Sequence, residues 1–257
     1  GTPTTMSVEM INRLFDTLKS NYDLSNVIEF TCEAGRPDTF TKEKLEALKN
    51  MGVTRISINP QVLNDETLRN LGRNHTVSDI ENAFSLAYDA GFEHINADLI
   101  AGADFNLENF KYSVDRLIRL GADNITIHSL TVKHGASYAE NDMSQIFSAA
   151  NKTGIINQMH QYAYNKLKEN GYFPYYLYRQ KNTLENLENT GYSKKHSECI
   201  YNIIMMDETH SVISFGAGAV TKIIKYEDTQ KISRVFNPKY PYEYIKNFDK
   251  VLQSKPE

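Results

Sequence analysis

The sequence has few of the features that mark membrane, disulfide-rich or nucleic-acid-binding proteins. Cysteine occurs twice in 257 residues, as Cys32 and Cys199. Two cysteines far apart cannot form a disulfide framework, a multi-cysteine zinc site or a self-contained cysteine-ligated iron–sulfur cluster, so we expect both to be buried apolar residues. Apolar runs are only a handful of residues long, too short to span a membrane. The net charge of −4 gives no general affinity for a nucleic acid backbone.

The composition is that of a folded globular protein. Hydrophobic residues make up 40% of the chain and charged residues 23%, and the mean hydropathy is −0.50. These values argue against disorder and predict a soluble protein. The length fits one large domain or two small ones. Because the sequence starts at Gly1 and its first methionine is Met6, we expect it to be part of a longer protein.

Helical and strand patterns alternate through the first half of the chain. We expect helices at 8–19, 42–51, 65–71, 79–90 and 107–120, with strands at 27–32, 53–58, 94–100 and 124–130. Ser7, Thr41 and Ser78 are candidate N-caps. The joints around Gly52, Gly91 and Gly121 repeat one pattern, in which a helix ends at a glycine and an isoleucine opens the next strand. Such βα repeats predict a parallel sheet, and their regular order favours barrel-like winding.

After about residue 135 this rhythm changes. We expect a helix at 155–170, a strand at 211–215 and a final helix at 242–252. The chain is therefore divided into a partial (β/α) barrel at 1–135 and a C-terminal α+β extension at 136–257, packed on the barrel. The loop Gly216-Ala217-Gly218 is interpreted as a tight turn rather than an anion site.

Polar side chains stand where four expected strands end. They are Glu33, the segment Asn59-Pro60-Gln61, Asp98, and the pair His128-Ser129. Ligands of parallel α/β folds bind at the carboxyl ends of the strands, so these residues form a candidate site. Asp98 is the most informative because it interrupts an apolar run, although a helix cap or an internal ion pair would also explain it.

The segment Tyr175–Asn182 is both aromatic and basic, with three tyrosines, Arg179 and Lys181. It could bind a flat anionic ligand by stacking and charge pairing. A half-buried edge strand explains the same residues slightly better. The remaining histidines have no metal-ligand spacing and are interpreted as structural or surface residues.

Several segments together resemble the radical S-adenosylmethionine proteins, and among them the oxygen-independent coproporphyrinogen III oxidases. In chain order they are Gly1-Thr2-Pro3-Thr4, Glu33-Ala34-Gly35-Arg36-Pro37, Arg55–Gln61, Asn64–Leu68, Leu71–His75 and Asp98–Gly102. The resemblance is specific over about residues 1–135, and weaker likeness covers most of the rest. It implies a partial parallel barrel, truncated at its N-terminus.

The resemblance also implies the cofactor site. Gly1, Thr2 and Pro3 match the motif that binds the amino group of S-adenosyl-L-methionine; Glu33, Gln61, Arg73 and Asp98 match other residues of that site. The three cysteines that hold the 4Fe–4S cluster lie upstream of this motif in the family and are absent here, so this chain is expected to bind no metal and to be inactive alone. Ala103-Asp104-Phe105 replaces the family's Leu-Pro-Gly.

By this resemblance the intact protein would be a cytoplasmic oxidoreductase of porphyrin and haem biosynthesis. It would decarboxylate propionate groups of coproporphyrinogen III to vinyl groups by radical chemistry, with an external electron donor. Arg36, Arg179 and Lys181 are the candidate cations for the substrate carboxylates. Two alternatives stay open: a haem chaperone on the same fold, for which Leu130–Gly135 is the better match, and a cluster-free α/β binding domain.

Overall fold

The protein was analysed as a computed structural model, which describes residues 2–131, 154–180, 183–226 and 229–254. The chain forms two compact units, Gly1–Cys199 and Ile200–Glu257. The expected division at 135 differs from this boundary. The reason is that two strands beyond residue 170 complete the sheet of the first unit.

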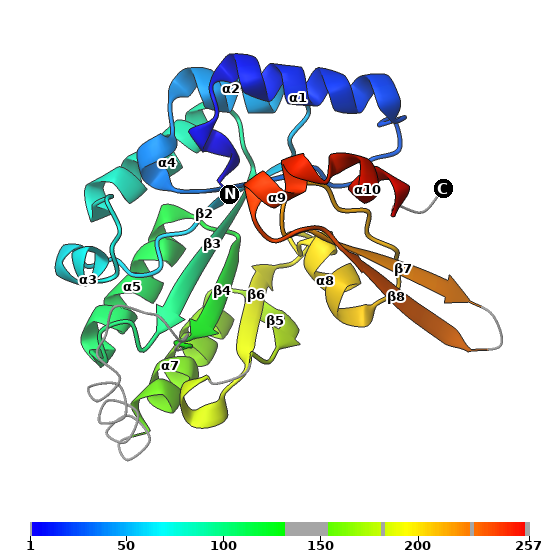
Figure 1. Cartoon of the computed structure of the whole chain (residues 1–257). Helices are drawn as coiled ribbons and strands as arrows, with labels where there is room; N and C mark the ends of the chain where they lie inside the picture. The colour runs from blue at the N-terminus through cyan, green and yellow to red at the C-terminus, as the bar shows by residue number, and fades with distance from the viewer. Residues whose placement is uncertain (1, 132–153, 181–182, 227–228, 255–257) are drawn as a thin grey trace. The chain divides into compact units, whose positions relative to one another are not determined.

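A six-stranded sheet is the centre of the first unit (Figure 1). Its strand order is β1-β2-β3-β4-β6-β5. The first four strands are parallel, whereas β6 pairs antiparallel with both β4 and β5. The strands are β1 (Thr31–Gly35), β2 (Arg55–Ile58), β3 (His94–Ala101), β4 (Asn124–Ser129), β5 (Tyr172–Tyr178) and β6 (Asn189–Lys194). The fold is the expected α/β partial barrel.

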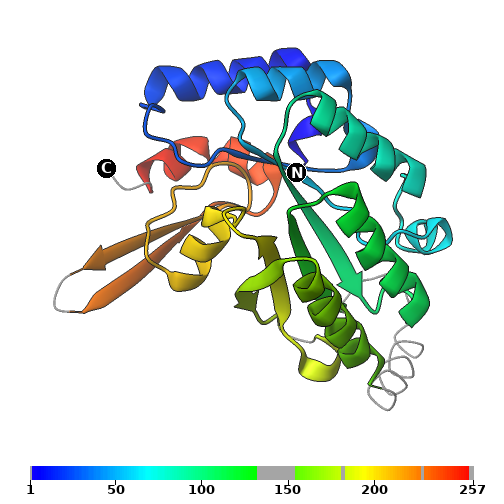
Figure 2. The ribbon, with the colours of Figure 1, turned by 180° about the vertical axis from the view of Figure 1, so that it is seen from behind.

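Helices α4, α5 and α7 cover one face of this sheet (Figures 1 and 2). The helices of this unit are α1 (Val8–Asn21), α2 (Lys42–Asn50), α3 (Asp65–Asn70), α4 (Val77–Asp89), α5 (Leu107–Leu120) and α7 (Ile155–Glu169), with short 3-10 turns η1 (Pro3–Thr5), η2 (Pro37–Thr39) and η3 (Leu184–Asn186). Ser7 and Thr41 are N-caps as predicted. The cap of α4 is Thr76 rather than Ser78, because Thr76 and Asp79 form a reciprocal capping box.

The two faces of the sheet differ in polarity. Side chains alternate along a strand, and the helix-covered face carries fully buried apolar residues such as Ile56, Leu99 and Ile127. The opposite face carries polar residues, among them the neighbours Ser57 and Asn96 and the neighbours Asp98 and Thr126. The apolar face fixes the register, and the polar face is thereby available for chemistry.

Local differences from the expected elements have identifiable causes. The first strand begins at Thr31 rather than at residue 27, because Val27 and Ile28 are exposed and pair with no strand. The segment 172–178 is an edge strand of the sheet, which confirms the interpretation of its aromatic residues as part of an edge strand. Strand β6 was not expected, since Thr190-Gly191-Tyr192 has no continuous apolar pattern. Cys32 and Cys199 are buried as predicted.

The second unit contains an antiparallel hairpin and three short helices. They are β7 (Val220–Tyr226), β8 (Gln230–Phe236), α8 (Ile200–Asp207), α9 (Pro241–Lys246) and α10 (Phe248–Gln253). The expected strand at 211–215 is reduced to a single bridge between Val212 and Lys222, and the expected final helix is broken at Asn247. Among the described residues no helix is both long and apolar enough to cross a membrane.

Candidate functional site

Glu33 lies on the polar face of the sheet at the carboxyl end of β1. Its Oε2 accepts a hydrogen bond from Ser57 Oγ at 3.1 Å, and the Asn59 side chain also hydrogen-bonds to it. Enclosure by the protein raises the pKa of Glu33, and the negative charge of Asp98 raises it further. Ser57 was missed by the sequence analysis, although its position two residues before Asn59 puts both on one face of the strand.

Gln61 is held beside Asp98 by the backbone. The Gln61 N–H donates to the Asp98 carbonyl at 2.9 Å, and the Ile100 N–H donates to the Gln61 carbonyl at 2.8 Å. Gln61 has φ of 69°, a left-handed conformation that is unfavourable for a residue other than glycine. Strain of this kind persists where the surrounding structure enforces it, often at a binding site. The loop after β2 is thus fixed against the carboxyl half of β3.

Asp98 also lies next to a histidine–tyrosine pair. His128 Nε2 on β4 is 3.5 Å from Asp98 Oδ2, and His128 Nδ1 is 2.8 Å from the hydroxyl oxygen of Tyr178 on β5. Burial, with the Asp98 charge, raises the pKa of Tyr178 to about 12. The phenol therefore stays protonated and can donate to Nδ1, in the tautomer that points Nε2–H toward Asp98.

The N-terminal segment joins this end of the sheet. Thr4 Oγ1 donates to the Ala34 carbonyl at 3.1 Å, and Lys44 Nζ donates to the Thr4 carbonyl at 2.7 Å. A Cβ at Gly35, which has φ of 60°, would lie 3.9 Å from Thr2 Oγ1 and 3.8 Å from Asn59 Nδ2. Thr2 and Pro3 are therefore close to the carboxyl end of β1. Gly1 lies outside the described residues.

Burial lowers the pKa of His75, and the charge of Arg73, which follows α3, lowers it further. His75 in turn interacts with the Pro60 carbonyl, which puts Arg73 near the loop of Gln61.

Asp104, in the replaced family loop, accepts hydrogen bonds from Thr67 and Asn109.

The candidate substrate cations are already paired. Arg36 Nη2 is 2.6 Å from Asp38 Oδ2, and Arg179 Nη2 is 3.5 Å from Glu188 Oε1. Lys181 lies outside the described residues. The site that the structure does bring together therefore consists of Thr2, Pro3, Glu33, Asn59, Gln61, Asp98 and His128.

Comparison with known proteins identifies the family. The model of the radical SAM superfamily matches residues 1–129. The chain belongs to this superfamily. It is 39% identical, over 99% of its length and 50% of the relative's, to the "oxygen-independent coproporphyrinogen-III oxidase-like protein HemZ" of Bacillus subtilis. It is 28% identical to the "heme chaperone HemW" of the same species, over 85% of the chain and 54% of the relative.

Solved structures agree on the fold. The coproporphyrinogen III oxidase HemN of Escherichia coli, a radical SAM enzyme, superposes with a TM-score of 0.69 at 20% identity, over 97% of this chain and 55% of HemN. The chain spans about half the length of the curated relatives it matches.

The polar end of the sheet fits S-adenosylmethionine, the cofactor of the superfamily. Asn59 Oδ1 is buried without a hydrogen-bond partner among the described residues, and it lies beside the Glu33 carboxylate. A buried acceptor without a partner costs free energy until a donor reaches it. An ammonium group and ribose hydroxyls are such donors, and Glu33 and Asp98 supply further acceptors.

A 4Fe–4S cluster does not fit this chain. Burial raises the pKa of Cys32 to about 11, which disfavours the thiolate that iron requires, and the Cys199 thiol donates to Glu29 Oε1 at 3.4 Å. No group of three histidine, cysteine or acidic side chains suited to a metal occurs within the described ranges.

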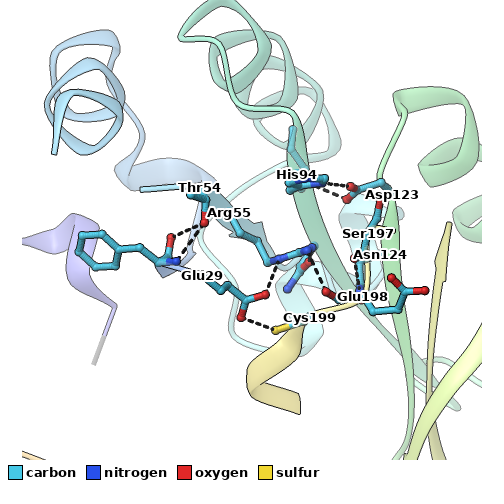
Figure 3. A network of polar contacts seen from close by, with 12 residues as sticks. Glu29, Thr54, Arg55, His94, Asp123, Asn124, Ser197, Glu198 and Cys199 are labelled. Atoms are coloured by element: carbon cyan, nitrogen blue, oxygen red, sulfur yellow. Dashed lines mark hydrogen bonds and ion pairs between the residues drawn. The ribbon is translucent and has the colours of Figure 1, made fainter. Parts of the chain in front are cut away.

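A second polar network lies at the opposite, amino-terminal end of the strands (Figure 3). Arg55 Nη1 donates to Asn96 Oδ1 at 2.8 Å, Arg55 Nη2 donates to the Glu198 carbonyl at 3.2 Å, and Arg55 Nε lies 3.4 Å from Glu29 Oε2. This network was not predicted from the sequence, although an arginine inside the apolar run Val53–Ile58 is a usable signal. Because this network is buried and its charged groups are paired, we interpret it as stabilising the sheet and not as a ligand-binding site.

Proposed function

We propose that this chain forms the S-adenosylmethionine- and substrate-binding part of a radical enzyme of the coproporphyrinogen III oxidase type. The observation that carries the proposal is the convergence of Glu33, Asn59, Gln61 and Asp98 at the carboxyl ends of β1, β2 and β3. Membership in the radical SAM superfamily and similarity to HemZ over the whole chain support it.

Each residue has a distinct role in this proposal. Thr2 and Pro3 present backbone groups to the methionine part of the cofactor. Glu33, oriented by Ser57, accepts from its ammonium group, and Asp98 accepts from its ribose hydroxyls. Gln61 and Arg73 complete the site. When bound, S-adenosylmethionine supplies the radical that the chemistry needs, and the cluster ligands would have to come from outside these residues.

The substrate of this proposed enzyme is coproporphyrinogen III, whose propionate groups would each lose a hydrogen atom, carbon dioxide and one electron to become vinyl groups, with S-adenosylmethionine consumed as the oxidant. Its carboxylates require cations. For Arg36 and Arg179 to serve, each would exchange its present partner, Asp38 or Glu188, for a substrate carboxylate. Lys181, two positions after Arg179 in the sequence, is proposed on its charge alone. An electron donor is the expected protein partner.

A haem chaperone is the second candidate, and similarity to HemW favours it. Turnover separates the two. The intact protein, given coproporphyrinogen III, S-adenosylmethionine and a reductant without oxygen, should form decarboxylated product if it is an oxidase. Haem binding without such turnover would instead support the chaperone.

Cofactor binding is tested by titration calorimetry of S-adenosylmethionine into the intact protein. Loss of one charge-assisted hydrogen bond in Asp98→Asn should weaken binding about 10- to 100-fold. Asp89→Asn, on the exposed side of α4, is the matched control and should bind like wild type. For this 257-residue chain alone we expect millimolar affinity, since metal chelation is missing. Micromolar binding by the chain alone, or an unchanged affinity in Asp98→Asn, would contradict the assignment.

A further inference from the structure

The tyrosines of β5 reach across β6 to contact β4. The Tyr176 hydroxyl is 3.0 Å from Thr126 Oγ1, and the Tyr178 hydroxyl is 2.8 Å from His128 Nδ1. In the sheet order β6 lies between β5 and β4. The two side chains therefore extend over the middle strand and line the polar face next to Asp98.

A glycine in β6 makes this arrangement possible. Gly191 pairs with Thr126 on one side and with Tyr176 on the other. A Cβ at Gly191 would overlap the Tyr176 ring. The backbone of Gly191 is not in the left-handed region, so the absence of a side chain serves the close approach of the ring rather than a turn.

The two rings are aligned with each other. The planes of Tyr176 and Tyr178 differ by 1°, with centroids 6.1 Å apart, and Tyr175 packs edge-on against Tyr176 at 4.8 Å. Hydrogen bonds to β4 hold both rings in place. Both rings are therefore pre-oriented, and a pyrrole ring parallel to either of them can stack on it without reorientation of the protein.

Tyr176 and Tyr178 are both partly exposed residues, and they adjoin the carboxylate that we assign to the cofactor. Asp98 raises the pKa of both Tyr176 and Tyr178, although burial is the larger cause for each. A group stacked on these rings would lie beside whatever Asp98 binds. Stacking surfaces that stay rigid before binding lose little conformational entropy when a ligand arrives.

We propose that Tyr176 and Tyr178 form the stacking surface for the pyrrole rings of a tetrapyrrole. Thr126 and His128 orient the two rings by hydrogen bonds, and Gly191 leaves room for the Tyr176 ring. This inference rests on the proposed function, because the tetrapyrrole class comes from it. It adds a specific location on the sheet, the edge formed by β4, β6 and β5, and it assigns His128 the role of a positioning residue that orients Tyr178.

The test is binding of metal-free coproporphyrin III to the intact protein, followed by its fluorescence. Tyr176→Ala and Tyr178→Ala should each weaken binding about three- to tenfold, since an aromatic pair is lost. Tyr176→Phe keeps the ring and loses only its hydrogen bond to Thr126, so its affinity should lie between those of wild type and Tyr176→Ala. Tyr164→Ala removes an exposed tyrosine from α7 and is the matched control.

Gly191→Ala tests the geometry without removing any polar group. It should weaken porphyrin binding as much as Tyr176→Ala does, because the new Cβ displaces the ring. If this variant fails to fold, the two tyrosine variants still decide the question. Wild-type porphyrin affinity in Tyr176→Ala and Tyr178→Ala, or an equal loss in Tyr164→Ala, would overturn the inference.

S-adenosylmethionine titration of the same variants separates this inference from the proposed function. We expect cofactor affinity to stay within twofold of wild type in Tyr176→Ala and Gly191→Ala. If the wild-type protein binds porphyrin through these tyrosines but does not bind S-adenosylmethionine, the proposed function is wrong and the stacking surface stands. If the cofactor binds and the porphyrin does not depend on the tyrosines, the stacking surface alone is wrong.

Discussion

Glu33 and Asp98 lie on the same face of the sheet, on the two strands that flank β2; burial raises the pKa of Glu33, and the charge of Asp98 raises it further. Ser57 and Asn59 donate hydrogen bonds to Glu33 and partly offset this repulsion. Two carboxylates this close are unfavourable for the free protein, but they are suited to a ligand that carries an ammonium group and several hydroxyls.

Glu33→Gln should therefore stabilise the protein at pH 7 while weakening S-adenosylmethionine binding. The folded-state pKa of Glu33 is raised, so its ionisation above the unfolded pKa of about 4.5 costs stability, and the cost disappears as the pH falls below that value. Because the residue remains exposed on one side, we expect a gain below about 1 kcal/mol in the free energy of unfolding.

Urea unfolding at pH 7 and pH 4 measures this effect, and calorimetry measures the affinity. Glu43→Gln is the control of opposite sign, because hydrogen bonds at the start of α2 lower the pKa of Glu43. A Glu33→Gln variant that is less stable than wild type at pH 7, or that binds the cofactor normally, would argue against a binding role for Glu33.

His160 should make the protein less stable as the pH falls from 6.5 to 4. Burial, together with the neighbouring His128, lowers its pKa to about 4, and its Nε2 is 2.8 Å from Ser129 Oγ. In this pH window the unfolded chain takes up a proton that the folded protein does not, so the free energy of unfolding falls by roughly 2–3 kcal/mol.

His160→Gln should flatten this part of the stability profile, measured by urea unfolding between pH 7 and pH 4. His210→Gln, at an exposed position of the second unit, is the control and should leave the slope unchanged. An equal slope in wild type and His160→Gln would show that His160 is protonated normally in the folded protein.

The sequence predicted the repeated elements well because their signals are local. The helix at Leu107–Leu120 was expected with the observed bounds, since an apolar stripe and the left-handed Gly121 mark it. The convergence of Glu33, Asn59, Gln61 and Asp98 followed from the rule that parallel strands carry sites at their carboxyl ends.

Strand β6 and the domain boundary could not be predicted in this way. The residues of β4 and β5 that pair with the same residue of β6 lie 49 or 50 positions apart in the sequence, and that pairing leaves no periodic pattern.

The pair of Arg55 and Glu29 belongs to the same group of non-local features, and it carries the last prediction. Only 4% of the Arg55 side chain and 11% of the Glu29 side chain is exposed. Arg55 also bonds to Asn96 and to the Glu198 carbonyl (Figure 3). Arg55→Met leaves the Glu29 carboxylate buried without its cation, which should cost about 3–5 kcal/mol of unfolding free energy.

The double variant Glu29→Leu with Arg55→Met tests the reason for that loss. If the cost comes from an uncompensated buried charge, removing both charges should recover most of the stability, because apolar pairs often replace buried ion pairs without loss. Lys42→Ala is the control: its pair with Glu46 is exposed, so the free energy of unfolding should change by less than about 0.5 kcal/mol. Urea denaturation of the four proteins measures all of these values. If the double variant is as unstable as Arg55→Met, charge compensation is not the cause of the loss. The hydrogen bonds of Arg55 to Asn96 and Glu198 would then be what stabilises the amino-terminal end of the sheet.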